Sequence, residues 1–283
     1  MNNGGSVKRG STSEDVYQRL RNLIIEGFYQ PNDRLPHPRL MRELGSGRTP
    51  LREALSRLQS EGLVVIQPNQ GASVAPMSPE TLEEAQVLRL LIEPPMLEAG
   101  LPHIDKKLLR RARELLVRME ETAGESAAFV RAHREFHAAM RSGYTNQVID
   151  DVVMRNYHHI HRHHQHFRPR TASPEEFILL DRVTLDAIEA GDGTCARQAF
   201  EFHLIDGALS LLLGEDPDNP LALLIPVAAA IGLDLRIPEN DARRPLELSW
   251  PQPAATLPAL ETANLKYEPS FPYDRIRSKG RPK

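Results

Sequence analysis

The sequence predicts a mainly α protein in two parts, followed by an irregular C-terminal extension. Residues 11–76 show helical periodicity interrupted by turn residues and close with two short β-branched runs, which indicates a small module with one hairpin. Residues 80–215 show only helical periodicity, broken by Gly and Pro, which predicts an all-α helical bundle. Beyond residue 217 the chain becomes rich in proline and loses this periodicity.

Composition and charge limit the class of protein. With 283 residues, 40% of them hydrophobic, the chain can form one large or two ordinary domains. The net charge of −3 excludes a uniformly basic nucleic-acid coat, but residues 1–76 carry +3 and the remainder −6. The single Cys195 excludes an intramolecular disulfide. No apolar run reaches bilayer length and no signal-peptide region is found, so we expect a cytoplasmic protein without a membrane segment.

The N-terminal module is predicted to run helix, helix, turn, helix, hairpin. Residues 1–10 are Gly-rich and basic and are expected to be a disordered arm. Ser11 and Glu14 have capping-box spacing before the first helix, which ends near Gly27. Further helices are expected over 38–44 and 48–61, and strands over 63–67 and 72–76. This order is that of a winged helix-turn-helix, spanning residues 11–76.

Two arginines stand at the start of the third helix. Pro50 fits only the first turn of a helix, which places Arg48 and Arg52 at its N-terminal end. In a DNA reader this end enters the major groove, where arginine pairs with guanine or holds a phosphate. On these residues alone, a solvated basic helix start is an equal alternative.

Several segments of this module resemble the GntR-type transcription regulators. They are Asp33-Arg34-Leu35, Leu40 to Gly45, Arg48-Thr49-Pro50-Leu51-Arg52-Glu53-Ala54-Leu55, Glu61-Gly62-Leu63-Val64 and Gly71-Ala72-Ser73-Val74-Ala75-Pro76. The resemblance implies that a double-stranded DNA operator is contacted by Arg34, Arg48, Thr49, Arg52 and the wing glycine Gly71. One departure is Ser46-Gly47, where the family usually has Val-Ser; Gly47 weakens the cap of the third helix.

After a short linker over 77–80, residues 81–216 are predicted to form the all-α domain. Its helices are expected over 80–99, 105–122, 125–142, 146–167, 173–190 and 193–214. Behind a GntR-type head, such a bundle resembles the FadR-like subgroup with its C-terminal FCD ligand-sensing domain. The resemblance implies a small carboxylate effector in this domain and a homodimer on a palindromic operator.

A metal site is predicted in this domain. His133 and His137 are four residues apart, so they share a helix face and can hold one divalent ion. The resemblance implies a fuller ligand set in the order Asp, His, His, His; the matching positions here are His133, His137, Asp181 and His203. One Asp and one His have exchanged places, and the resulting set suits Zn²⁺, Ni²⁺, Mn²⁺ or Fe²⁺. A degenerate site without metal is the alternative.

Six of the eleven histidines lie between residues 158 and 166. On a helix they point in all directions and cannot all bind one metal, so we interpret the segment as a polar helix with one face toward a ligand cavity. Arg162 within it, and Arg89 on the first helix of the domain, are predicted to pair with an anionic effector. Either arginine equally fits a structural ion pair.

The expected function is a ligand-responsive, DNA-binding transcription regulator rather than an enzyme, acting as a repressor that a small organic or sugar acid releases from DNA. A metal-dependent enzyme retaining a DNA-binding head is one alternative, and a metal-free acyl-CoA-responsive regulator is another. Residues 217–283 are expected to be partly disordered with one docked helix, and no role is assigned to them.

Overall fold

The computed structural model describes residues 11–122, 126–144, 146–167, 174–216, 218–236, 246–252, 254 and 265–267. The arm predicted for residues 1–10 lies outside these residues, as does much of the C-terminal extension. The chain divides into two compact units. The first unit contains residues 1–78 together with 158–166, and the second contains the remainder.

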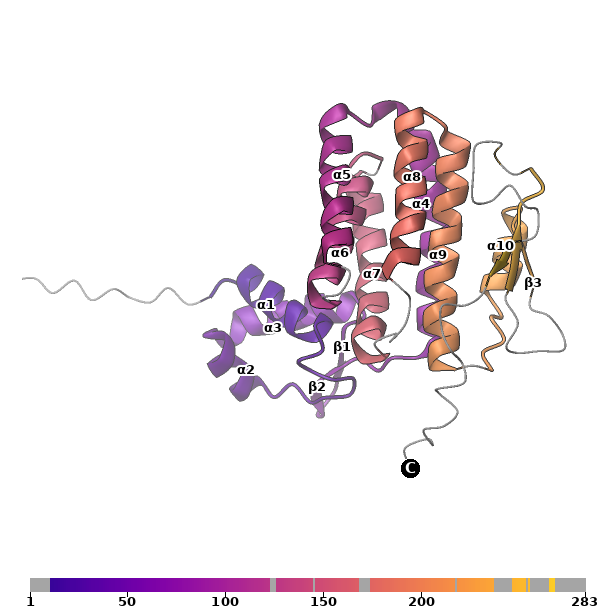
Figure 1. The fold of residues 1–283 in the computed structure, drawn as a ribbon. Helices are drawn as coiled ribbons and strands as arrows, with labels where there is room; N and C mark the ends of the chain where they lie inside the picture. Colours follow the sequence, from indigo (N-terminus) through magenta and orange to yellow (C-terminus); the bar gives the residue numbers. More distant parts are fainter. Residues whose placement is uncertain are drawn as a thin grey trace, which may run out of the picture. The chain divides into compact units, whose positions relative to one another are not determined.

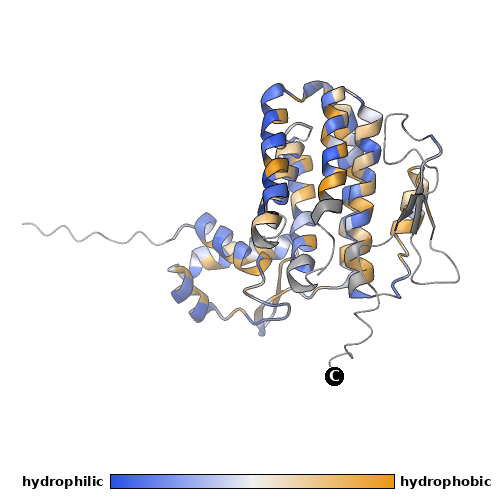
Figure 2. Cartoon of the chain, viewed as in Figure 1, coloured by the Kyte–Doolittle hydropathy of each residue, from blue (hydrophilic) through white to orange (hydrophobic). Residues whose placement is uncertain are grey.

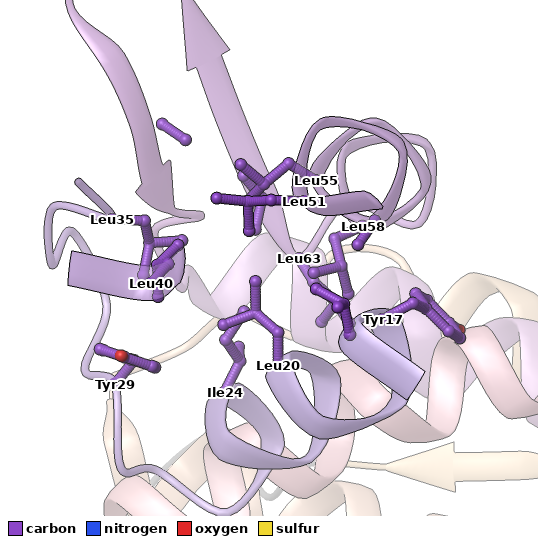
Figure 3. Close-up of a cluster of buried hydrophobic side chains, with 14 of the residues drawn as sticks. Tyr17, Leu20, Ile24, Tyr29, Leu35, Leu40, Leu51, Leu55, Leu58 and Leu63 are labelled. Atoms are coloured by element: carbon purple, nitrogen blue, oxygen red, sulfur yellow. The ribbon is translucent and has the colours of Figure 1, made fainter. Parts of the chain in front are cut away.

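The first unit is a winged helix-turn-helix, as the sequence predicts. Its elements are α1 (Ser13–Ile25), α2 (His37–Leu44), α3 (Arg48–Ser60), β1 (Val64–Gln67) and β2 (Gly71–Val74). The two strands pair antiparallel, with Val64 opposite Val74 and Gln67 opposite Gly71. Apolar side chains from all three helices and the hairpin form one buried core (Figure 3). These contacts fix α3 against the other helices and leave its opposite face to solvent.

The cap of α1 differs by one residue from the prediction. Thr12 and Asp15, not Ser11 and Glu14, form the capping box. The Ser11 hydroxyl instead donates to the carbonyl of Leu44, at 2.9 Å. Ser11 therefore makes a tertiary hydrogen bond and does not cap α1, as its local spacing had predicted.

Most of the second unit is a bundle of helices (Figure 1). Its helices are α4 (Pro79–Gly100), a short 3-10 turn η1 (Leu101–His103), α5 (Lys106–Glu121), α6 (Ser126–Ser142), α7 (Gln147–Phe167), α8 (Pro174–Ala190) and α9 (Gly193–Glu215). Helix α9 packs against α4 and α8, and α5 packs against α6 and α8. Hydrophilic residues lie along the outer face of α5, whereas its buried face is apolar (Figure 2). The C-terminal part of α7, residues 158–166, is assigned to the first unit.

The extension contains more structure than the predicted single helix. It forms α10 (Leu224–Ala230) and a three-stranded antiparallel sheet of β3 (Asp234–Arg236), β4 (Leu246–Ser249) and β5 (Leu265–Tyr267). Glu83 of α4 accepts hydrogen bonds from the backbone N–H groups of Leu223 and Leu224 and so caps α10. The strands are three or four residues long, too short to give a periodic signal in the sequence. Across the described ranges, each helix falls short of the length and apolarity needed to cross a membrane.

Candidate functional site

The exposed end of α3 is the candidate DNA-binding surface. The helix has Gly47 as its N-cap, with φ −81° and ψ 175°, and no side chain caps it. Its first backbone N–H groups are therefore left to solvent or to a ligand. Arg48, Thr49 and Arg52 are all exposed, while the opposite face of α3 is buried in the core. The expected loss of the cap at Gly47 is present in the structure.

The arginines of the first unit fall into two sets. Arg57 lies over the Tyr17 ring at 3.6 Å and pairs with Glu14 at 2.8 Å, so it stabilises the fold. Arg39 pairs with Glu43 at 2.7 Å. Within the described residues, four exposed arginines of this unit make no ion pair and no side-chain hydrogen bond: Arg34, Arg42, Arg48 and Arg52. These four retain their charge and donors for an external partner.

The wing is the β1–β2 hairpin, and its second strand pairs with the segment that carries another predicted contact, Arg34. Gly71 is exposed with φ +84°, a left-handed conformation that favours glycine, and a Cβ there would meet no other atom. Arg34 pairs through its backbone with Ser73 of β2. Its side chain is therefore presented from the base of the hairpin.

The second unit brings the four predicted metal ligands together. His133 and His137 lie on α6, Asp181 on α8 and His203 on α9. One ligand atom from each residue lies within 4.8 Å of the corresponding atom of every other. Three of the four residues are buried, and His133 is partly exposed. Residues up to 70 positions apart in the chain thus converge on one point.

The distances within this cluster match the edges of a coordination polyhedron. His133 Nε2 and His137 Nε2 are 2.9 Å apart. The Asp181 carboxylate lies 3.3 Å from His133 Nε2, 3.5 Å from His137 Nε2 and 3.6 Å from His203 Nδ1. Metal–ligand bonds of about 2.0–2.2 Å place neighbouring ligand atoms roughly 3 to 3.5 Å apart.

The hydrogen bonding and protonation of the cluster's side chains also fit a metal site. Asp181 Oδ2 is buried and has no hydrogen-bond partner, an arrangement that is unfavourable unless a cation satisfies it. Burial, aided by the neighbouring His133 and His203, lowers the pKa of His137 well below its usual range. Burial lowers the pKa of His203 to about 4, against the opposing effect of Asp181. Neutral imidazoles are the form that binds metal, and they cannot neutralise Asp181 as a salt-bridge partner would.

The two predicted effector-binding arginines have different surroundings. Arg89 is buried in the second unit, where its Nε lies 2.5 Å from Glu93 Oε1 and its guanidinium lies over the Tyr157 ring at 5.5 Å. Its charge contributes to lowering the pKa of both His137 and His203. The structure therefore places Arg89 near the cluster.

Arg162 belongs to the first unit, with the buried part of the histidine-rich segment. Its guanidinium donates to the carbonyl of Ala75 at 2.5 Å, and burial lowers its pKa to about 10. In the same unit His159 Nε2 lies 3.2 Å from the carbonyl of Glu61. These contacts support the structural interpretation of Arg162.

Comparison with known proteins identifies both units. Residues 12–74 match the family described as bacterial regulatory proteins, gntR family, and residues 84–206 match the FCD domain. An HTH-type transcriptional regulator in an unstable DNA locus of Streptomyces ambofaciens is 30% identical over 192 residues, which cover 67% of this chain and 80% of that protein. The chain belongs to the GntR family.

Two further relatives of this GntR-family protein are informative. The HTH-type transcriptional repressor GlaR of Escherichia coli is 44% identical over 71 residues, 25% of this chain and 32% of that protein. The solved structure of Escherichia coli McbR/YncC superposes with a TM-score of 0.64 at 20% identity, covering 73% of this chain and 99% of that one, which supports the fold.

The protein is therefore a DNA-binding transcription regulator with an FCD ligand-binding domain, of the FadR-like subfamily. Its family and its relatives are transcription regulators, not enzymes. The histidine–aspartate cluster could hold a metal ion in the domain where metal binding is common.

Two arginines that the structure distinguishes, one in each unit, were not identified from the sequence. Arg42 joins the unpaired set on the first unit, and nothing in its local sequence distinguishes it from the paired Arg39. Arg141 is buried in the second unit, four residues after His137 and thus on the same helix face. The spacing that identified the histidine pair could also have identified Arg141.

Proposed function

We propose that this GntR regulator is a repressor that binds a palindromic operator as a homodimer and is released by a small organic or sugar acid bound in a helical pocket that contains a metal ion. The observation that carries the proposal is the convergence of His133, His137, Asp181 and His203, with a buried aspartate oxygen that has no hydrogen-bond partner. Sequence similarity to the repressor GlaR, which extends over 71 residues, supports the proposal that this protein represses transcription.

On the DNA side, the proposal assigns base and phosphate contacts to the unpaired arginines. Arg48 and Arg52 lie at the exposed N-terminal end of α3, the position from which a recognition helix reads the major groove. Arg34 and Gly71 of the wing would contact the backbone or the minor groove. A dimer would present two such heads to two half-sites related by its own twofold axis.

On the effector side, the four ligands would hold Zn²⁺, Ni²⁺, Mn²⁺ or Fe²⁺. A divalent ion held by three imidazoles and one carboxylate supplies open coordination positions that a carboxylate can occupy. Arg89 pairs with Glu93, and its charge still acts on His137 and His203, so we assign it to the same anionic ligand. Binding there releases the operator by favouring a state of the cytoplasmic protein with lower DNA affinity.

The test compares His137→Ala with His103→Ala, an exposed histidine outside the cluster. The readouts are metal content after dialysis, by inductively coupled plasma mass spectrometry, and affinity for a duplex selected by the wild-type protein from a random library. We expect His137→Ala to lose its metal while His103→Ala retains it, and both to bind the selected duplex in the absence of acids.

Full metal content in His137→Ala would show that the ligand set is wrong. A wild-type protein that takes up none of the four metals would refute the metal site and favour a metal-free sensor. Failure of the wild type to select any duplex would refute the DNA assignment itself.

A further inference from the structure

The C-terminal end of α7 is part of the DNA-binding unit. Residues 158–166 of this helix group with residues 1–78, and they carry the histidine-rich segment to which the proposed function gives no role. Two side chains of the segment, His159 and Arg162, contact backbone carbonyl groups of the winged helix-turn-helix. The unit that reads DNA therefore includes a helical segment from well beyond residue 78.

His159 contacts the end of α3. Its Nε2 lies 3.2 Å from the carbonyl oxygen of Glu61, the C-cap residue of α3. Because a carbonyl oxygen only accepts, Nε2 carries the proton and donates. The imidazole also covers Gly62, where a Cβ would lie 3.2 Å from both Cε1 and Nε2. Gly62 has φ +75°, the left-handed conformation that ends many helices, so the ring packs against the residue at which the chain leaves α3.

Arg162 contacts the end of the wing. Its Nη2 donates to the carbonyl oxygen of Ala75 at 2.5 Å, and the residue is 4% exposed. Ala75 follows β2 directly, and its N–H donates to the carbonyl of Leu63 at 2.9 Å. A hydrogen bond from a charged group is stronger than one between neutral groups, and burial keeps water from competing for it. Arg162 therefore holds the chain where it leaves the hairpin.

Both contacts fall on one joint of the unit. Glu61 and Gly62 immediately precede Leu63, and the backbone of Ala75 pairs with the same Leu63. Leu63 belongs to the buried core and precedes β1, so the chain passes from α3 into the wing at this residue (Figure 3). The two α7 side chains are three residues apart and share one side of their helix. The end of α7 thus holds both chain segments that meet at the joint.

The angle between α3 and the wing matters for DNA binding. In the proposed complex, Arg48 and Arg52 of α3 enter the major groove while Arg34 and Gly71 of the wing contact the backbone or the minor groove. Both sets reach the duplex together only if the joint holds them at a matching angle. A joint that is fixed before binding also avoids the loss of conformational entropy that a flexible one would suffer on binding.

We propose that His159 and Arg162 are positioning residues for DNA recognition, which hold α3 and the wing at the angle that lets both contact the operator at once. This assignment rests on the proposed function, because it takes the DNA contacts of α3 and the wing from it. It adds to the DNA-binding machinery two side chains that do not touch DNA and that lie outside residues 11–76.

The test uses the full-length protein and the duplex selected by the wild type. Arg162→Met keeps an unbranched chain without donors, and Arg162→Lys keeps a charged donor. His159→Ala removes the imidazole, and His159→Gln keeps a side-chain N–H. Arg155→Met is the matched control, since Arg155 is an exposed arginine of the same helix. Affinity is measured by fluorescence anisotropy of the labelled duplex, and the melting temperature of each DNA-free protein by calorimetry.

We expect Arg162→Met to weaken binding about tenfold, equivalent to about 1.4 kcal/mol, and His159→Ala to weaken it about threefold. Arg162→Lys and His159→Gln should each recover part of the loss, because each restores a donor for the carbonyl. Arg155→Met should bind within about twofold of the wild type, because it removes the same charge from an exposed position.

A double-variant cycle with Arg34→Ala separates positioning from a general loss of stability or charge. Arg34→Ala removes a proposed wing contact and should cost the wild type about fivefold in affinity. In the Arg162→Met background it should cost less than about twofold, because the wing is no longer held against the duplex. If Arg162 only stabilised the fold or added positive charge, the two losses would multiply.

The outcomes separate this inference from the function on which it rests. Normal binding by both Arg162→Met and His159→Ala, or losses that multiply with Arg34→Ala, would overturn the positioning role. If neither Arg162 variant folds, as judged by melting, the same cycle with His159→Ala decides the question. A wild type that selects no duplex refutes the proposed DNA contacts themselves, whereas a wild type that binds its duplex while every α7 variant binds equally well refutes the positioning role alone.

Discussion

Replacing Asp181 by asparagine should change stability in opposite directions with and without metal. The side chain is 1% exposed, and Oδ2 has no hydrogen-bond partner. The low pKa values of His137 and His203 leave these neighbours neutral at pH 7, so they do not compensate the carboxylate charge. Removing a poorly satisfied buried charge should leave the metal-free protein equally stable or more stable, by up to about 2 kcal/mol.

The metal-loaded protein should respond in the other direction. Zn²⁺ at about one hundred times its dissociation constant stabilises the wild type by about 2.7 kcal/mol, which corresponds to a rise in melting temperature of ~5–10 °C for a chain of this size. Asp181→Asn removes the charged ligand and should lose most of that rise. Differential scanning calorimetry in EDTA and in Zn²⁺ measures both effects on one sample.

A matched control lies on the same helix. Asp186 of α8 is half-exposed and pairs with Arg113, so Asp186→Asn should leave the Zn²⁺-induced rise unchanged. If Asp181→Asn destabilises the metal-free protein by several kcal/mol while keeping the full Zn²⁺ effect, the carboxylate is a structural hydrogen-bonding group and the reasoning is wrong.

Three further predictions concern the first unit and pH. Arg52→Ala should abolish binding to the selected duplex in fluorescence anisotropy without lowering the melting temperature, whereas Arg110→Ala should bind normally; unchanged affinity of Arg52→Ala contradicts the groove assignment. Gly47→Ser should stabilise the protein by about 0.5–1 kcal/mol in urea unfolding, because the backbone already has N-cap geometry and a Cβ there meets only Pro50 Cδ at 3.8 Å; a loss of stability would show strain at this turn. Since the folded pKa of His203 is about 4, below the unfolded value of about 6.5, the unfolded chain takes up the proton first on acidification, and EDTA-treated protein should lose about 2 kcal/mol between pH 7.5 and 5 through this residue. His203→Gln should remove that part of the pH dependence, and identical slopes in both proteins would refute the burial argument.

Local sequence patterns predicted the helices because most of them are long and amphipathic. The third helix and its exposed arginines followed from one proline and an apolar stripe. Local patterns could not predict which charged side chains form contacts within the protein. Arg57 and Arg52 lie on the same helix, yet Arg57 stacks on Tyr17 of α1 whereas Arg52 is free. That difference depends on tertiary contacts between α1 and α3. The strands of the extension were missed because they are too short for alternation to be recognised.

The exchange of His and Asp between two of the predicted metal-ligand positions can be judged from the distances within the cluster. The side chain of Asp181 reaches less far than the imidazole that the family resemblance implies at this position. In the structure it is the residue whose oxygens lie 3.3–3.6 Å from all three histidines. Helix α8, which carries Asp181, packs directly against α9, which carries His203, and His133 of α6 is the partly exposed member of the cluster. The exchange therefore keeps a donor set of three imidazoles and one carboxylate, and these donors converge on one point.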